Sequence, residues 1–171
     1  MQEILQNCPE AHIKVAGISV LGVNGIKSRI KIPAYGKYLR RLILKNRLEG
    51  KVRVLGNLSA EEMKREYLSA QIFVCPSAVE NSPNSVAEGQ LLGVPVAASR
   101  TGGIPDVVKD GVSGLLFEKG NVHELAACVS RILTDKQLAK ELSASGRETA
   151  AKLYNGENNY QKLIEIYQSI E

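Results

Sequence analysis

The feature of this sequence that most restricts its fold is a pair of short apolar runs on either side of a helix pattern. The runs cover residues 71–75 and 95–98, and proline or glycine bounds each of them. Between them, Asn84 or Ser85 is a favourable N-cap for a helix that continues to Leu92, where a glycine follows. The segment is therefore predicted to form a strand, a loop, a short helix and a second strand.

The rest of the chain continues this alternation. Further strands are predicted at residues 12–16, 51–55 and 115–117. Helices are predicted at residues 1–8, 35–48, 59–69, 104–109, 121–133, 135–153 and 157–170. Residues 17–33 form a long polar and glycine-containing connection. Strands that alternate with helices indicate an α/β fold, a Rossmann-like parallel sheet with helices on both faces.

Two of the predicted helices open on recognisable caps. Ser59 is followed three residues later by Glu62, and this spacing is that of a capping box. Asn121 is followed in the same way by Glu124, which predicts a second cap and box.

Polar residues gather around the start of the helix between the two apolar runs. Free backbone N–H groups at a helix N-terminus can hold a phosphate, and here they belong to the segment Ser82, Pro83, Asn84 and Ser85. Glu80 precedes this helix and Glu88 lies about one turn inside it. Because ionised carboxylates accept two hydrogen bonds from a vicinal diol, the pattern suits a sugar-phosphate ligand such as a nucleotide sugar. The alternative is that the two glutamates only favour the helix dipole.

Residues 76–99, followed by 101–106, closely resemble the donor-site segment of retaining glycosyltransferases with the GT-B fold. The match is to the group-one, or family-four, set, in which a Glu, seven residues and a second Glu stand between Pro-Ser and Gly-Val-Pro-Val, as Glu80 and Glu88 do here. The resemblance extends from about residue 12 to the C-terminus. It implies one half of a GT-B fold, and a parent enzyme of polysaccharide biosynthesis that transfers a sugar from a nucleotide-diphosphate sugar to a glycan or lipid-linked acceptor with retention.

The resemblance also implies roles for individual residues. Glu88 is expected to bind the ribose hydroxyls, and Glu80, the candidate catalytic residue, the hydroxyls of the transferred sugar. The amides of residues 82–85 would stabilise negative charge on the leaving diphosphate. Gly102 and Gly103 would lie near the donor phosphates, although a tight turn explains the same pair.

The resemblance predicts that residues 1–171 are a C-terminal nucleotide-sugar-binding domain, truncated at its N-terminus and without the acceptor domain. No Arg and Lys pair that matches the family's diphosphate ligands precedes residue 12. Residues 157–171 resemble the helix that crosses back to the missing domain. We expect its apolar side to be exposed or to pair with another copy in a homodimer, and this fragment alone to be inactive.

The composition argues against a metalloprotein, a disulfide-bonded secreted protein and a membrane-spanning protein. No two His or Cys residues have metal-ligand spacing, so we expect neither a metal nor another cofactor, only the donor substrate. Cys8, Cys75 and Cys128 are widely spaced, which is typical of a reducing compartment. No apolar stretch is long enough to span a membrane and no signal segment opens the chain, so a cytoplasmic location is expected.

Basic residues are concentrated between Lys27 and Arg53, where ten Lys or Arg accompany one acidic residue, Glu49. Such a stretch could attract an anionic acceptor or the inner face of a membrane, to which the protein would be peripheral. A solvated helix face is the alternative. Aromatic residues are not interleaved with the basic ones as in RNA-binding proteins, so nucleic acid is not expected as a partner.

Three other functions fit parts of the pattern. A glycoside hydrolase also uses two carboxylates, as acid and as nucleophile or base. A nucleotide-sugar epimerase or a sugar phosphorylase has a similar architecture. A non-catalytic nucleotide-sugar-binding module needs the same ligand contacts without turnover, and this chain supports binding better than turnover.

Overall fold

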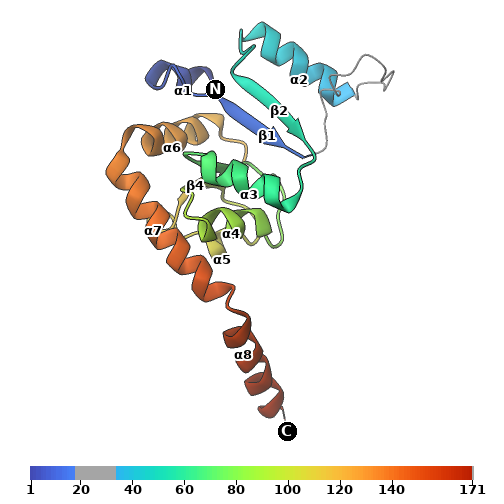
Figure 1. The fold of residues 1–171 in the computed structure, drawn as a ribbon, viewed down its shortest axis with the longest axis vertical. Helices are drawn as coiled ribbons and strands as arrows, with labels where there is room; N and C mark the ends of the chain where they lie inside the picture. The colour runs from blue at the N-terminus through green and yellow to red at the C-terminus, as the bar shows by residue number, and fades with distance from the viewer. Residues whose placement is uncertain (18–33, 171) are drawn as a thin grey trace. The chain divides into compact units, whose positions relative to one another are not determined.

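The structure is a computed structural model that describes residues 1–17 and 34–170 (Figure 1). The chain separates into two compact units, residues 1–66 and 67–171. From residue 18 onward, the predicted connection at residues 17–33 lies outside the described residues.

The first unit contains a two-stranded parallel sheet. Its elements are α1 (Gln2–Asn7), β1 (Ile13–Ala16), α2 (Ala34–Lys45), β2 (Val52–Gly56) and most of α3 (Ala60–Ser69). β1 and β2 run side by side in the same direction, with Ile13 opposite Val52 (Figure 1). The parallel pairing is the one expected for strands that are joined through a helix.

The start of α3 and the end of α2 show how local chemistry places helix ends. The Ser59 N–H donates to Glu62 Oε2 at 2.8 Å, and the Glu62 N–H donates to Ser59 Oγ at 3.3 Å. The predicted capping box is therefore confirmed. The helix predicted to reach residue 48 ends earlier, because the Asn46 side chain donates to the Leu42 carbonyl at 2.8 Å and Arg47 has a left-handed φ of 52°.

The second unit contains a three-stranded parallel sheet in the order β3-β4-β5. Its elements are β3 (Phe73–Cys75), α4 (Asn84–Leu91), β4 (Val96–Ser99), α5 (Ile104–Val107), β5 (Leu115–Phe117), α6 (Val122–Thr134), α7 (Lys136–Leu153) and α8 (Gly156–Gln168). Phe73 pairs with Val96, and Ala97 pairs with Leu115. The α/β, Rossmann-like class predicted from the sequence is thus confirmed, with parallel strands covered by helices.

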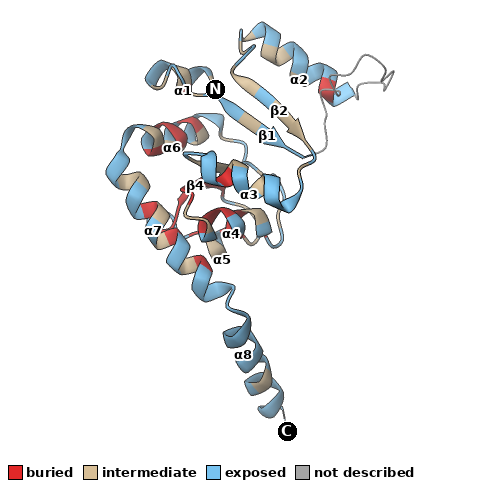
Figure 2. Cartoon of the chain, viewed as in Figure 1, coloured by how far each residue is buried: buried red, intermediate tan, exposed pale blue. Residues whose placement is uncertain are grey.

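The core of the second unit surrounds β4, whose four residues are all buried. α4 and α6 pack on β4, and α7 packs on α4 (Figure 2). One apolar cluster joins the three strands to α4 and α5 through the side chains of Cys75, Val86, Val96, Ala98, Ile104, Val108 and Leu116. Because β4 presents small residues here, the helices can approach the sheet closely and hold its carboxyl edge in place.

The cap predicted for α6 is half confirmed. Asn121 Oδ1 accepts hydrogen bonds from the backbone N–H groups of His123 and Glu124, both at 3.2 Å. The Glu124 carboxylate does not complete the box, because it accepts from the Glu118 N–H at 2.7 Å instead. This bond ties the end of β5 to the start of α6.

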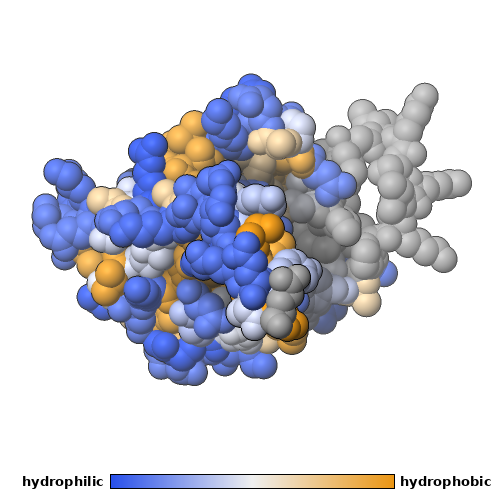
Figure 3. Space-filling view, turned by 90° about the horizontal axis from the view of Figure 1, so that it is seen from below, coloured by the Kyte–Doolittle hydropathy of each residue, from blue (hydrophilic) through white to orange (hydrophobic). Residues whose placement is uncertain are grey.

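α8 buries none of its residues. Large apolar side chains remain exposed along it, at Tyr160, Leu163, Ile166, Tyr167 and, just after it, Ile170. Figure 3 looks at this end of the chain, where apolar side chains lie at the surface among hydrophilic ones. Across the described ranges, no helix combines the length and apolar character that crossing a membrane requires.

Candidate functional site

Two loops follow neighbouring strands at the same edge of the sheet in the second unit. β3 and β4 are parallel, with Cys75 opposite Ala98, so their carboxyl ends lie together. The loop at residues 76–83 leaves β3 and carries Glu80, and the loop at residues 100–103 leaves β4 and carries the glycine pair. This is the edge at which parallel α/β sheets bind ligands.

Hydrogen bonds join the loop after β3 to the last residue of β4 and to the loop that follows it. Ser99 Oγ donates to the Ser77 carbonyl at 2.6 Å, and Thr101 Oγ1 donates to the Ala78 carbonyl at 3.3 Å. The Gly103 N–H donates to the Glu80 carbonyl at 3.3 Å. The backbone that carries Glu80 is therefore held by the loop after β4.

Gly102 and Gly103 are needed for this close approach. A Cβ atom at Gly102 would overlap with the carbonyl oxygen of Glu80, and one at Gly103 would overlap with the carbonyl oxygen of Asn81. Gly102 also has a φ of +51°, a conformation that side-chain-bearing residues rarely adopt. The pair is therefore more than a tight turn, since it brings two of the predicted site segments into contact.

The start of α4 differs in detail from the prediction. Its N-cap is Pro83, which is buried and makes no side-chain cap, so the expected capping by Asn84 or Ser85 is wrong. Pro83 has no N–H, and the Asn84 N–H donates to the Ser82 carbonyl at 2.9 Å. In the part of the chain that the structure describes, the N–H groups of Ser82 and Ser85 donate to no protein acceptor. Two of the four predicted residues thus keep amides available to an anion.

The two glutamates lie on either side of this helix start. Glu80 is half-buried in the loop after β3, and Glu88 is exposed one turn into α4. Accessible carboxylates near available amides can accept hydrogen bonds from a ligand's hydroxyl groups while the amides donate to its phosphates.

Tyr67 is a site residue that the sequence did not reveal. It lies in the last turn of α3 and is only 3% exposed. Its hydroxyl donates to the Ser85 carbonyl at 2.9 Å and lies 3.5 Å from Glu88 Oε2. Burial, and then the neighbouring Glu88 carboxylate, raise the pKa of the Tyr67 phenol above its ordinary value, so the hydroxyl keeps its proton and remains a donor.

The cation nearest in sequence to the glycine pair is engaged elsewhere. Arg100 pairs with Asp110 at 2.8 Å and with Glu118 at 3.0 Å. Within residues 1–17 and 34–170, no three His, Cys, Asp or Glu side chains gather closely enough to hold a metal ion. The groups that the described residues place around the helix start include the backbone amides of Ser82 and Ser85 and the carboxylates of Glu80 and Glu88.

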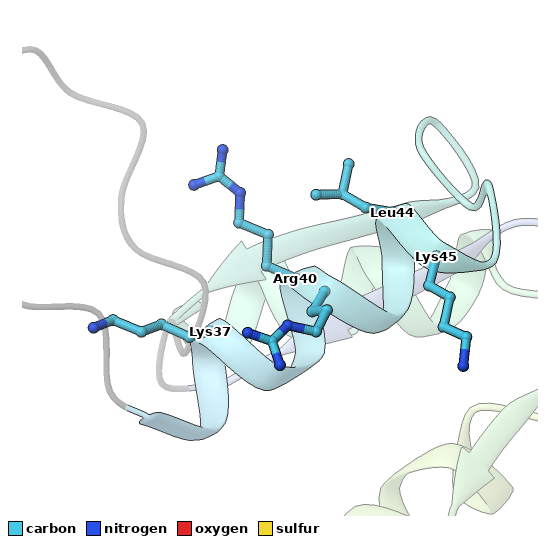
Figure 4. A pocket seen from close by; sticks show the side chains of 5 residues that line it. Lys37, Arg40, Leu44 and Lys45 are labelled. Atoms are coloured by element: carbon cyan, nitrogen blue, oxygen red, sulfur yellow. The ribbon is translucent and has the colours of Figure 1, made fainter.

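A second polar surface lies on α2 in the first unit. Lys37, Arg40, Arg41, Leu44 and Lys45 line an open hollow on this helix (Figure 4). None of these cations forms an ion pair with another described residue. Tyr35 and Tyr38 are also exposed, at 61% and 55%. This surface contains none of the predicted donor-site residues.

Most of the sequence matches a known family. A model of the glycosyl transferases group 1 family matches residues 1–149, and the chain belongs to this family. An uncharacterized glycosyltransferase of Methanocaldococcus jannaschii is 27% identical over 165 residues, which are 94% of this chain and 46% of the relative. The chain thus spans about half the length of that relative.

Solved structures show the same fold. The HepE protein of Anabaena in complex with UDP superposes with a TM-score of 0.80 and 22% identity, over 99% of this chain and 45% of that one. The C-terminal domain of a glycosyl transferase group 1 family protein from Francisella tularensis superposes with a TM-score of 0.68 and 16% identity. In that case 90% of this chain and 92% of the other are covered. The fold is therefore that of one half of a GT-B structure.

Proposed function

We propose that this chain is the donor-binding domain of a glycosyltransferase and holds a nucleotide-diphosphate sugar at the start of α4. The observation that carries the proposal is the junction of the two loops, in which Gly102 and Gly103 press against the backbone of Glu80 and Asn81. This junction places a glutamate-bearing loop, a glycine turn and the start of a helix at one edge of a parallel sheet. The UDP complex of the Anabaena protein supports a nucleotide as the ligand class.

In this proposal, each part of the site takes one part of the donor. The N–H groups of Ser82 and Ser85 donate to the diphosphate, Glu88 accepts from the ribose hydroxyls, and Glu80 accepts from the hydroxyls of the sugar. Donors fixed at a helix start stabilise charge on the departing diphosphate without having to reorganise. Transfer with retention to a glycan or lipid-linked acceptor, in a cytoplasmic polysaccharide pathway, remains a prediction from the family resemblance.

The test is a calorimetric titration of the chain with UDP, GDP, ADP and their glucose conjugates, without added metal. We expect one nucleotide and its sugar conjugate to bind, and the bound form to unfold at a higher temperature. If none of these ligands binds the folded chain, the proposed function is rejected. Binding that requires a divalent metal would contradict the prediction that neither a metal nor another cofactor takes part.

The alternatives give different results in parallel assays. Release of sugar from a simple glycoside would indicate a hydrolase. Cofactor-free epimerisation of the nucleotide sugar, or phosphate-dependent cleavage of a glucan, would indicate an epimerase or a phosphorylase. A non-catalytic module would bind the donor but would transfer no sugar even when an acceptor domain is present.

We also propose that the basic surface of α2 makes a peripheral contact with an anionic membrane. Its cations are unpaired among the described residues, and Leu44 and Tyr38 lie exposed beside them at 53% and 55%. An anionic bilayer offers phosphates to the cations and an interfacial zone that suits tyrosine and leucine. Each basic residue near such a surface contributes about 1 kcal/mol of attraction.

Reversing the charge of Lys37 and Arg41 to glutamate is expected to weaken binding to vesicles of phosphatidylglycerol and phosphatidylcholine by about tenfold or more. The matched control reverses Lys136 and Lys140, which are exposed on α7 and change the net charge equally. Co-sedimentation with vesicles measures the effect. Equal losses in both variants would contradict a specific contact through α2. So would binding of the unaltered chain to pure phosphatidylcholine vesicles that is as strong as its binding to the anionic vesicles.

The exposed apolar side of α8 supports the prediction of a crossing helix or of a homodimer contact. Leu163 and Ile166 are 48% and 56% exposed. Apolar surface of this kind favours a partner. Analytical ultracentrifugation that finds only monomer at high concentration would reject the homodimer.

A further inference from the structure

Tyr67 is the first residue of the second unit, and its hydroxyl lies against the part of α4 that carries Glu88. It is 2.9 Å from the Ser85 carbonyl in the first turn of α4, and 3.5 Å from Glu88 Oε2. The Tyr67 ring lies at 66° to the Phe73 ring, with centroids 5.2 Å apart. The ring thus packs in the core while the hydroxyl lies at the base of the exposed carboxylate.

Packing alone does not require this hydroxyl. A phenylalanine at residue 67 would keep the edge-to-face contact with Phe73 and would avoid the cost of burying a polar group. The Tyr67 hydroxyl has a single proton, and both nearby acceptors belong to α4, one in its backbone and one in the side chain of Glu88. The Tyr67 hydroxyl therefore contacts the part of α4 to which the proposed function assigns nucleotide binding.

An exposed glutamate that bears no such contact samples several rotamers, and ordering it on ligand binding costs up to about 1.5–2 kcal/mol. A hydroxyl that is fixed by its bond to the Ser85 carbonyl and lies 3.5 Å from one carboxylate oxygen restricts these rotamers before the ligand arrives. The second oxygen and the remaining lone pairs stay available for hydroxyl groups. This is preorganisation, in which a fixed protein group lowers the entropic cost of binding.

We infer that Tyr67 is a positioning residue that holds Glu88 and the first turn of α4 in place for the ribose diol, and that it thereby favours ribonucleotides over deoxyribonucleotides. The inference rests on the proposed function, because it assigns Glu88 to the ribose.

The experiment compares Tyr67→Phe with the unaltered chain, using whichever of UDP, GDP and ADP the unaltered chain binds, together with its 2′-deoxy and 3′-deoxy analogues. We expect Tyr67→Phe to weaken ribonucleotide binding by about three- to tenfold, the effect of one ordinary hydrogen bond. Binding of the deoxy analogues should change by less than about twofold, because the diol contact is already lost in them. The control is Tyr160→Phe, which removes a hydroxyl that is exposed on α8.

A double-mutant cycle with Glu88→Gln separates positioning from a general structural role. If Tyr67 acts through Glu88, Tyr67→Phe causes no further loss of affinity in the Glu88→Gln background. Binding stoichiometry in calorimetry reports the folded fraction, so reduced folding does not imitate reduced affinity. An equal loss for ribo and deoxy ligands, or the same loss in both backgrounds, would overturn the inference.

Failure of the inference and failure of the proposed function give different results. If the unaltered chain binds a nucleotide and Glu88→Gln weakens it while Tyr67→Phe does not, the proposed function stands and the inference falls. If the unaltered chain binds no nucleotide, both fall.

Discussion

Replacing Gly102 by alanine is expected to destabilise the second unit by about 3 kcal/mol or more and to abolish donor binding. Two costs add at this position. A left-handed conformation costs a side-chain-bearing residue about 1–2 kcal/mol, and overpacking typically costs about 1–3 kcal/mol. Here φ is +51°, and the new methyl group would overlap with the Glu80 carbonyl oxygen. Urea unfolding measures the stability, and nucleotide titration of the folded fraction measures the binding.

Two other glycines separate the cost of the left-handed backbone from the cost of steric overlap. Gly120 has a φ of +82°, and nothing lies within 4 Å of the position that a Cβ atom would take, so Gly120→Ala should show the backbone cost alone. Gly103 has an ordinary φ of −79° but approaches the Asn81 carbonyl, so Gly103→Ala should show the overlap alone. Gly102→Ala should therefore be the most harmful of the three variants. A loss at Gly102 no larger than that at Gly120 would mean that the loop around Glu80 yields easily, and that the glycine pair does not hold it.

The order of elements could be predicted because it depends on local chemistry. Apolar runs with proline or glycine at their ends gave β3, β4 and β5, and the Ser59 and Asn121 caps marked the starts of α3 and α6. The prediction failed at the start of α4, because Pro83 is buried and the turn closes through the backbone without a side-chain cap. The packing around a proline depends on the tertiary structure and not on residue preference.

The site could be predicted only in part, for a similar reason. The sequence identified Glu80, Glu88 and the glycine pair, but the contact between Gly102 and the Glu80 carbonyl joins segments that are more than 20 residues apart. Tyr67 was missed because it lies in a different helix from Glu88, 21 residues earlier. In the sequence it is one aromatic residue on an amphipathic helix, which ordinarily indicates core packing. The one available hint was a tyrosine, rather than a leucine or phenylalanine, at a core position.

Replacing Glu88 by glutamine is expected to weaken binding of both the nucleotide and its sugar conjugate, whereas Glu80→Gln should weaken only the sugar conjugate. A hydrogen bond to a charged group contributes about 1.5–3 kcal/mol, so each loss should be about ten- to a hundredfold. Glutamine keeps the size of the side chain and removes its charge, and Glu88 is exposed, so folding should be little affected. Calorimetric titrations with the nucleoside diphosphate and its glucose conjugate measure both effects.

The two variants act as controls for each other, because each removes one carboxylate from the same edge of the sheet. A Glu80→Gln variant that binds the bare nucleotide as well as the unaltered chain does must still have an intact α4 start. Its loss of sugar affinity can then be assigned to the sugar contact. Equal losses for both ligands in both variants would instead indicate that each substitution disturbs the start of α4 as a whole. Unchanged nucleotide affinity in Glu88→Gln would remove Glu88 from the ribose, and with it the reason for the buried hydroxyl of Tyr67 beneath it.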